Sequence, residues 1–378
     1  KIKNENYSYR DIEKILDKIE KIALNQNYEF IDAKVTEVVN DNKINFSFKI
    51  IDTEKLYVNK INILGNNITS EKFIRDQLIV DEGDPFNKIL HAKSINKLKS
   101  KNLFSKVEFE ILDTENADQK DINISIEEKP TGELMAGAGH GTDGSTFSIG
   151  ISENNFKGEG VKLNSKLSLS EETVKGFIEY THPNFAFSDR ELSTSLESTV
   201  TDRLTNYGYK SSLNSVSLGT RYEQFENTFF SPKLSISSET LDTTSTASES
   251  YKKQDGSYFD TTFGYGLTLD KRNSAFQPSS GYYSNWFQSL PIVSENSEIV
   301  NGYIITGYKE LIDDMIVSSG IYTRAVNSLT GDDVRASKRL YVPSSRLRGF
   351  ESGKVGPTDG TDHVGGNYVV TLNTSSTI

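Results

Sequence analysis

Polar and apolar positions follow a helical period at the start of the chain and a strand period soon after it. From Tyr7 to Leu24, apolar residues recur at intervals of three and four, which predicts an amphipathic helix of about four turns. Residues 33–38 and 44–50 then alternate between polar and apolar side chains on either side of a turn at 40–42. This change of period predicts a helix followed by a β-hairpin.

Residues 54–130 carry a fuller version of the same arrangement. Alternation predicts strands at 57–64, 106–112 and 121–127, with two helices between the first strand and the second, and Ser70 is the expected N-cap of the first helix. The helix residues expected to face the core are Phe73, Ile74, Leu78, Ile89, Ala92, Ile95 and Leu98. The predicted order is strand, helix, helix, strand, strand.

An internal repeat links these two segments. In both, an aromatic residue ends the loop after the last helix and a strand containing Val follows, at 28–35 and at 103–107. Residues 1–53 are therefore predicted to be a partial α+β module whose first strand is missing, and residues 54–130 a complete one.

Helical periodicity disappears after Pro130, and about twelve alternating runs follow. In one of them Val161, Leu163, Leu167 and Leu169 share a face, and polar side chains occupy the other. The runs are about 10–14 residues long, whereas strands of soluble proteins average about five or six. We therefore predict that residues 131–378 form an antiparallel transmembrane β-barrel.

The connections between these runs alternate between two ends of the predicted barrel. One end is expected to hold the connections at 154–160, 181–189, 223–228, 270–280 and 312–314, and the other the long ones at 239–256 and 328–362. A missing N–H group costs no ladder hydrogen bond in a connection. The prolines expected there are Pro183, Pro278, Pro291, Pro343 and Pro357, whereas Pro232 falls inside an expected strand and argues against it.

The amino-acid composition argues against several classes of protein. Aromatic residues make up 10% of the chain, which does not fit a disordered protein, and a net charge of −11 argues against a nucleic-acid partner. The chain has no Cys and therefore no disulfide framework. No segment reaches the ~20 apolar residues of a membrane helix. No signal peptide opens the sequence, and we expect a fragment clipped at both ends.

No catalytic, cofactor-binding or metal-binding residues are expected. No pair of histidines has the spacing of metal ligands, and no phosphate-binding loop is present. We interpret the four histidines as surface or loop residues: His91, His140, His182 and His363. The chain is accordingly expected not to be an enzyme.

Four segments resemble one known family. Residues 131–160 are similar to the first barrel hairpin of the outer-membrane protein assembly factor BamA family, and 269–281 to its periplasmic-turn motif. Residues 347–350 resemble its loop signature, and 365–367 the start of the following strand. The resemblance covers essentially the whole chain. It implies polypeptide-transport-associated (POTRA) modules in residues 1–130, and about twelve of sixteen barrel strands in 131–378.

The loop signature, Leu347-Arg348-Gly349-Phe350, has a physical interpretation of its own. An Arg beside a Gly can present its guanidinium fork inside a barrel, where a carboxylate would hold it bidentately. The resemblance implies that this loop folds into the lumen as a latch, with the carboxylate partner of Arg348 on strands beyond Ile378. An ordinary exposed turn is the alternative.

Two further groups of residues are predicted sites. Asp270, Arg272, Pro278 and Gly281 form the expected turn motif, which orders a turn and does no chemistry. The first barrel strand contains the other group: Gly132, Glu133, Leu134, Gly137, Gly139 and Gly141. Glycine weakens a strand by roughly 0.5–1 kcal/mol relative to Ala. The resemblance implies that this strand forms a weak seam that opens to pair with an incoming strand, and relief of crowding at a barrel rim is the alternative.

The function implied by the resemblance is assembly and insertion of β-barrel proteins into the bacterial outer membrane, with the POTRA modules in the periplasm. Its partners would be unfolded outer-membrane protein clients, accessory lipoproteins of the assembly complex and outer-membrane lipid. A two-partner secretion or translocation-module transporter is the first alternative. A passive porin and a soluble all-β adhesin or enzyme are the others, and the modules and long runs argue against them.

Overall fold

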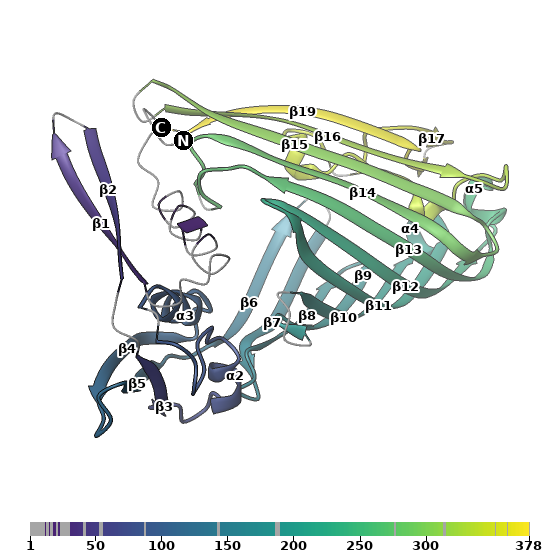
Figure 1. Cartoon of the computed structure of the whole chain (residues 1–378). Helices are drawn as coiled ribbons and strands as arrows, with labels where there is room; N and C mark the ends of the chain where they lie inside the picture. The colour runs from purple at the N-terminus through teal and green to yellow at the C-terminus, as the bar shows by residue number, and fades with distance from the viewer. Residues whose placement is uncertain are drawn as a thin grey trace. The chain divides into compact units, whose positions relative to one another are not determined.

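The computed structural model describes residues 31–40, 43–52, 56–86, 88–141, 144–185, 190–275, 277–312, 315–351, 353–360 and 362–377, and the single residues Ile12, Ile15, Lys18, Ile19 and Ile22. The chain divides into two compact units. Unit 1 comprises residues 1–131 and 154–160, and unit 2 comprises 132–153 and 161–378. Figure 1 shows the elements of both. The helix predicted at 7–24 lies outside the described residues apart from those single positions.

Unit 1 begins with the predicted hairpin. Strands β1 (Ile31–Asn40) and β2 (Lys43–Asp52) pair antiparallel along their whole length, from Ile31 opposite Asp52 to Asn40 opposite Lys43. The alternation of residues 33–38 and 44–50 therefore predicted this hairpin correctly.

The rest of unit 1 has the predicted order of elements. These are β3 (Tyr57–Leu64), α2 (Glu71–Arg75), α3 (Lys88–Ser100), β4 (Phe104–Asp113) and β5 (Gln119–Glu128). Ser70 caps α2, because its side chain accepts a hydrogen bond from the Phe73 N–H at 3.2 Å. The sheet order is β3-β5-β4, with β5 parallel to β3 and antiparallel to β4. Apolar side chains between sheet and helices, including Ile74, Leu98 and Ile122, form the core.

The face of α3 that packs on this sheet differs from the predicted one. His91, Ser94, Ile95 and Leu98 are buried, whereas Ala92 is exposed. His91 is only 4% exposed, so its interpretation as a surface or loop residue was wrong. Its position four residues before Ile95 places it on the apolar face of the helix, where its ring packs edge-on against Phe109.

The main sheet of unit 2 is antiparallel, and each of its strands neighbours the next one along the chain. Its twelve strands are β6 (Gly132–Gly141), β7 (Gly144–Phe156), β8 (Val161–Ser170), β9 (Thr173–His182), β10 (Glu191–Arg203), β11 (Tyr209–Phe225), β12 (Thr228–Thr243), β13 (Gly256–Asp270), β14 (Gly281–Ser294), β15 (Glu298–Ile312), β16 (Met315–Ser328) and β19 (Tyr368–Thr377). The last residues of β7 belong to unit 1. The predicted twelve-stranded antiparallel arrangement is confirmed, and β6 and β19 are the two ends of the sheet order.

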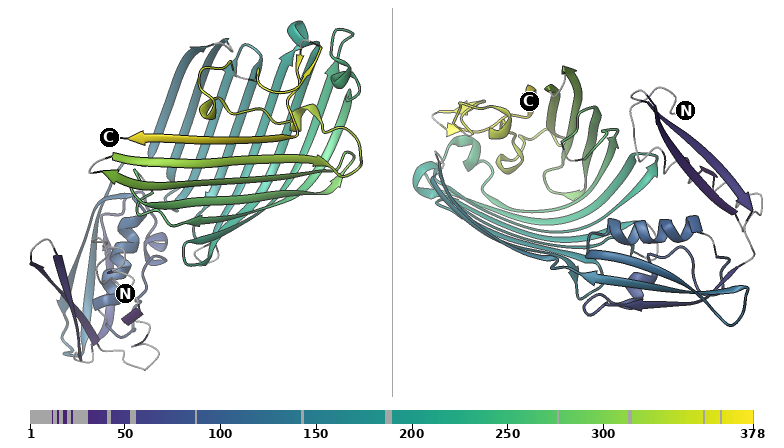
Figure 2. Two further views of the ribbon diagram at one scale, coloured as in Figure 1. Left: turned by 90° about the horizontal axis from the view of Figure 1, so that it is seen from above. Right: turned by 90° about the vertical axis from the view of Figure 1, so that its left-hand side faces the viewer.

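The sheet is strongly curved, and the segment between β16 and β19 lies on its concave side (Figure 2). That segment contains the 3-10 helices η2 (Ala336–Lys338) and η3 (Ser344–Arg346) and the short strands β17 (Thr358–Asp359) and β18 (Asp362–His363). The shorter connections carry α4 (Leu204–Tyr207) and α5 (Glu249–Lys252). We call residues 329–367 the long loop.

Side chains of the sheet sort onto two faces, as the alternation predicted. Leu196, Val216 and Ile236 lie side by side on neighbouring strands and are all more than 40% exposed. On the opposite face Ser217 and Ser235 are paired by their hydroxyl groups at 2.9 Å. The sheet therefore presents an apolar face and a polar face, the pattern of strands that contact lipid on one side.

Two prolines differ from their predicted positions. Pro291 lies inside β14 rather than in a connection, next to a register shift against β13 between Thr261 and Thr262. A β-bulge leaves a residue unpaired, so the missing N–H group of a proline is tolerated there. Pro232 lies within β12 opposite Tyr265, so it does not break the strand as its sequence position suggested.

No helix among the described residues is long and apolar enough to cross a membrane.

Candidate functional site

Strand β6 holds the predicted seam residues, and it is an edge of the sheet. It pairs with β7 from Gly132 opposite Glu153 to Gly141 opposite Gly144. Glu133 and Leu134 follow Gly132, and the Leu134 side chain is 72% exposed.

The glycines of β6 are not required by crowding among the described atoms. A Cβ atom added to Gly139 would have no heavy atom within 4 Å, and one added to Gly137 would meet only the Ser148 hydroxyl, at 3.4 Å. At Gly132 the nearest atom would be the flexible carboxylate of Glu153, at 2.8 Å. The described atoms therefore leave room for a side chain at Gly137 and Gly139.

The predicted turn motif connects β13 to β14 and forms a closed set of contacts. The Arg272 guanidinium donates to both carboxylate oxygens of Asp270, at 2.8 Å and 2.7 Å, and lies over the Tyr283 ring. Gly281 has φ of +91°, and a Cβ atom there would be 2.1 Å from the Lys271 carbonyl oxygen. Pro278 lies in the same connection. The motif therefore orders the turn between two strands.

The loop signature lies in the long loop, directly after η3. Leu347 is partly buried, whereas Arg348, Gly349 and Phe350 are exposed, with Phe350 at 63%. Gly349 adopts φ of +83°. The latch role of Arg348 remains a prediction.

A different arginine of the same loop is buried. Arg335 is 3% exposed and contacts the carboxylates of Glu239, Asp260 and Glu298, which come from β12, β13 and β15. This group was not predicted from the sequence. Each acid occupies a position on the polar face of its strand, but acids at such positions also face water in many barrels, so the sequence gives no signal that one arginine gathers them.

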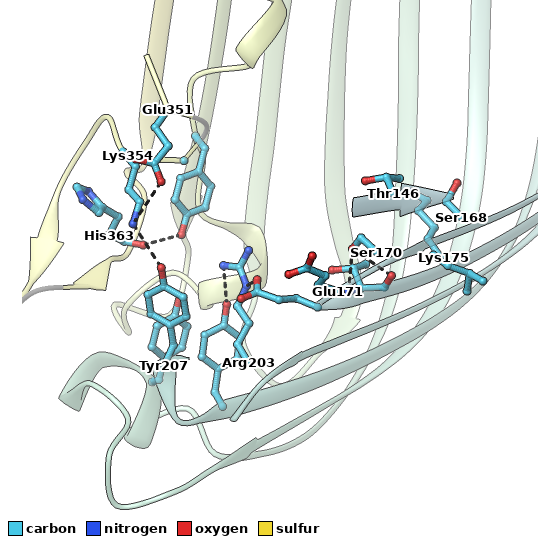
Figure 3. Close-up of a pocket in the computed structure, with 17 residues that line it drawn as sticks. Thr146, Ser168, Ser170, Glu171, Lys175, Arg203, Tyr207, Glu351, Lys354 and His363 are labelled. Carbon is cyan, nitrogen blue, oxygen red and sulfur yellow. Dashed lines mark hydrogen bonds and ion pairs between the residues drawn. The ribbon is translucent and has the colours of Figure 1, made fainter. Parts of the chain in front are cut away.

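A cavity of about 750 Å³ lies between the long loop and the wall formed by β7 to β11. Figure 3 shows Thr146, Ser168 and Lys175 on the strand side, and Lys354 and His363 on the loop side. Ion pairs and hydroxyl groups line much of it.

Tyrosine rings form part of the lining of this cavity. The rings of Tyr209 and Tyr251 stack with centroids 4.3 Å apart, and burial raises the pKa of Tyr251 well above its ordinary value. Arg203 pairs with Glu172 at 2.6 Å, and Lys354 donates to the Tyr207 hydroxyl at 3.4 Å. The Lys354 contact attaches the long loop to α4, and the Ser250 N–H, which donates to Asp359 at 3.0 Å, attaches it to α5.

Comparison with known proteins agrees with this architecture. The family model described as the Omp85 superfamily domain matches residues 155–378, and the POTRA model, described as surface antigen variable number repeat, matches residues 56–129. The chain belongs to the Omp85 superfamily. It is accordingly an outer-membrane protein with a periplasmic POTRA module, as the resemblance implied.

Its relatives include proteins named outer membrane protein assembly factor BamA. One from Nitratidesulfovibrio vulgaris is 21% identical over 364 residues, which cover 91% of this chain and 44% of the relative. One from Neorickettsia risticii is 24% identical over 339 residues, which cover 87% of this chain and 45% of the relative. The chain thus spans less than half the length of these two relatives.

A solved structure shows the same fold. The crystal structure of BamA from Haemophilus ducreyi lacking POTRA domains 1–3 has a TM-score of 0.72 and 21% sequence identity. The match covers 97% of this chain and 76% of the other. The fold class predicted from the sequence, a POTRA region followed by an antiparallel transmembrane β-barrel with about twelve strands present, is therefore confirmed.

Proposed function

We propose that this Omp85 protein takes part in the assembly and insertion of β-barrel proteins into the outer membrane. The names of its curated relatives support this activity, and these relatives align with about nine-tenths of the chain. No covalent chemistry is needed, because a strand that adds to a sheet edge gains its affinity from backbone hydrogen bonds.

The observation that supports the mechanism is the pair of uncrowded glycines in β6. Weak packing at Gly137 and Gly139 would let β6 exchange its partner on the side away from β7 for an incoming client strand. Arg272 and Asp270 would hold a turn of the barrel rigid while this edge changes.

The POTRA module offers a second edge for partners. Among the described strands, β4 pairs with β5 alone in the order β3-β5-β4, and Phe109 of β4 is 45% exposed. Accessory lipoproteins or unfolded clients would add a strand there. Outer-membrane lipid is the third expected partner, at the apolar face of the sheet.

The first experiment depletes the parent protein in its host and measures the levels of other outer-membrane barrels. We expect those levels to fall. Unchanged levels would contradict the assembly function and leave the fold untouched.

The second experiment tests β6 with a matched pair of glycines. An added Cβ atom meets nothing within 4 Å at Gly139 in β6 or at Gly176 in the interior strand β9. Replacing glycine by a β-branched residue stiffens a strand by roughly 1 kcal/mol. Gly139→Val should therefore slow client assembly several-fold, and Gly176→Val should not. Equal rates in the two variants would remove the case for a weak seam.

A further inference from the structure

We infer that Arg335 is a positioning residue that fixes the start of the long loop to the concave face of the sheet, independently of the predicted latch at Arg348. The inference rests on the proposed function only in supposing that the position of this loop matters for assembly. The structural part, an anchor made by one buried arginine, stands on contacts within unit 2.

Arg335 uses both its backbone and its side chain in this anchor. Its backbone N–H donates to one carboxylate oxygen of Glu298 at 2.7 Å, and Nε and Nη2 donate to the other at 3.3 Å and 3.1 Å. Nη1 donates to Glu239 at 3.4 Å, and Nη2 also donates to Asp260. The guanidinium lies 4.9 Å from the centre of the Tyr258 ring. The branched guanidinium can reach several acceptors in this way, whereas a lysine ammonium is a single point of charge.

Neighbouring contacts fix the backbone on both sides of Arg335. The Gln254 amide donates to the Val334 carbonyl oxygen at 3.2 Å and accepts from the Ala336 N–H at 2.7 Å. Val334 and Leu340 are buried against Val326 of β16. The start of the loop is therefore packed and hydrogen-bonded over several residues.

The charges show how strongly the anchor depends on this arginine. Arg335, Glu239, Asp260 and Glu298 are each less than 10% exposed, so three carboxylates surround one guanidinium away from water. Lys338, 3.9 Å from Asp260 and partly exposed, is the second cation nearby. Burial alone would lower the pKa of Arg335, but its hydrogen bond to Asp260 and the charge of Glu298 raise it. Removing the guanidinium would leave the buried carboxylates without their main partner.

The anchor restricts the positions that the rest of the loop can adopt. A loop as long as residues 329–367 would usually be disordered without such a contact. With Arg335 fixed, the signature at 347–350 lies only a short stretch of chain beyond a rigid point. Arg348 therefore needs only one further contact to select its position, which reduces the ordering cost of any latch that it forms.

The test measures the position of the loop in the purified, membrane-reconstituted protein. The chain has no Cys, so spin labels on introduced cysteines at Ser238 of β12 and Ser345 of the loop, both exposed, would be unique. We expect one narrow distance distribution in the parent. Arg335→Met should broaden it and should speed tryptic cleavage after Arg339 on the order of 100-fold, because breaking a buried ion pair is strongly destabilising. Arg335→Lys should restore part of the order.

A second variant keeps the test valid if Arg335→Met fails to fold. Combining Arg335→Met with Glu239→Gln, Asp260→Asn and Glu298→Gln leaves no buried charge unpaired, so the sheet should fold while the loop stays loose. Arg348→Met is the control and should keep the narrow distribution. A narrow distribution in the neutralised variant would overturn the inference. Normal client assembly with a loose loop would instead contradict only the link to the proposed function.

Discussion

A buried histidine gives the POTRA module a pH dependence that can be traced to one side chain. His91 packs against Phe86 and Phe109, and its Nε2 atom has no hydrogen-bond partner among the described residues. Burial lowers the pKa of His91 below its ordinary value of 6.5. The neutral ring is therefore the form that the folded module holds.

Protonation should destabilise the module through this residue. Below pH 6.5 the unfolded chain takes up a proton that the folded module excludes, so the free energy of unfolding should fall as the pH is lowered through 6.5. His91→Leu should remove this dependence. Hydrogen-exchange protection of β3 and β5, corrected for the intrinsic exchange rate, would measure it at several pH values. His140→Gln, outside the module, is the control, and a slope that survives in His91→Leu would assign the effect to another group.

At the scale of elements, the turn after β7 is built into unit 1. The Asn155 amide donates to the Thr69 hydroxyl at 2.9 Å and accepts from the Gly160 N–H at 2.8 Å. The Gly158 carbonyl oxygen accepts from the Ser70 N–H at 2.9 Å. Asn155 and Thr69 are both buried. The turn that resembles the family's first hairpin thus folds together with the start of α2.

The carboxylate of Glu128, in β5, binds the backbone just before α2, next to the contacts of Asn155. It accepts the backbone N–H groups of Asn67, Ile68 and Thr69, at distances from 2.6 to 3.2 Å. Burial alone would raise the pKa of Glu128, but the hydrogen bonds from Thr69, Ile68 and Asn67 outweigh it and lower the pKa. The carboxylate therefore stays ionised and holds these amides.

The tight fit of Gly160 in this turn predicts a large effect of one methyl group. Gly160 has φ of +64°, and a Cβ atom there would lie 2.1 Å from the Phe73 ring. Gly160→Ala should destabilise unit 1 by about 2 kcal/mol or more, because backbone strain adds to the displacement of a core ring. Gly83→Ala is the matched control, since Gly83 also lies in unit 1, its φ is also positive at +91°, and no atom lies within 4 Å of the added methyl. Urea-dependent hydrogen exchange of α2 and β5 would show the difference, and equal midpoints for the two variants would refute the packing argument.

Elements with a clear period were the ones that the sequence predicted well. The bounds of β3 were predicted to the residue from the apolar positions between Tyr57 and Leu64, although a register shift between Val58 and Lys60 interrupts their alternation. The buried face of α3 was predicted wrongly, because the prediction relied on apolar residues alone. His91 and Ser94 occupy buried positions on that face where apolar residues were expected. Pro291 was misplaced because a bulge depends on the partner strand, which the local sequence does not describe.

At the scale of the whole molecule, the sequence predicted the two faces of the sheet but not the cluster around Arg335. Alternation relates residues that are close together along the chain, so it can be recognised in a single sequence. Arg335 meets carboxylates that lie 37, 75 and 96 residues away, and no periodicity relates such positions. The seam, turn and loop-signature residues came from resemblance to a family, and the structure now shows where each lies.

The two faces of the sheet should differ in how well they tolerate a charged side chain. Val216 and Ser215 are neighbours in the middle of β11, but Val216 lies on the apolar face beside Leu196 and Ile236, and Ser215 on the polar face. In a membrane-embedded sheet, Val216→Arg should cost about 2–4 kcal/mol, whereas Ser215→Arg should cost little because its side chain faces the water-filled interior. The folded fraction in lipid vesicles, read from heat-modifiable gel mobility across a urea series, would compare them. If the two arginines had the same cost, the apolar face would not contact lipid, and the assignment of these strands to the outer membrane would have to be given up.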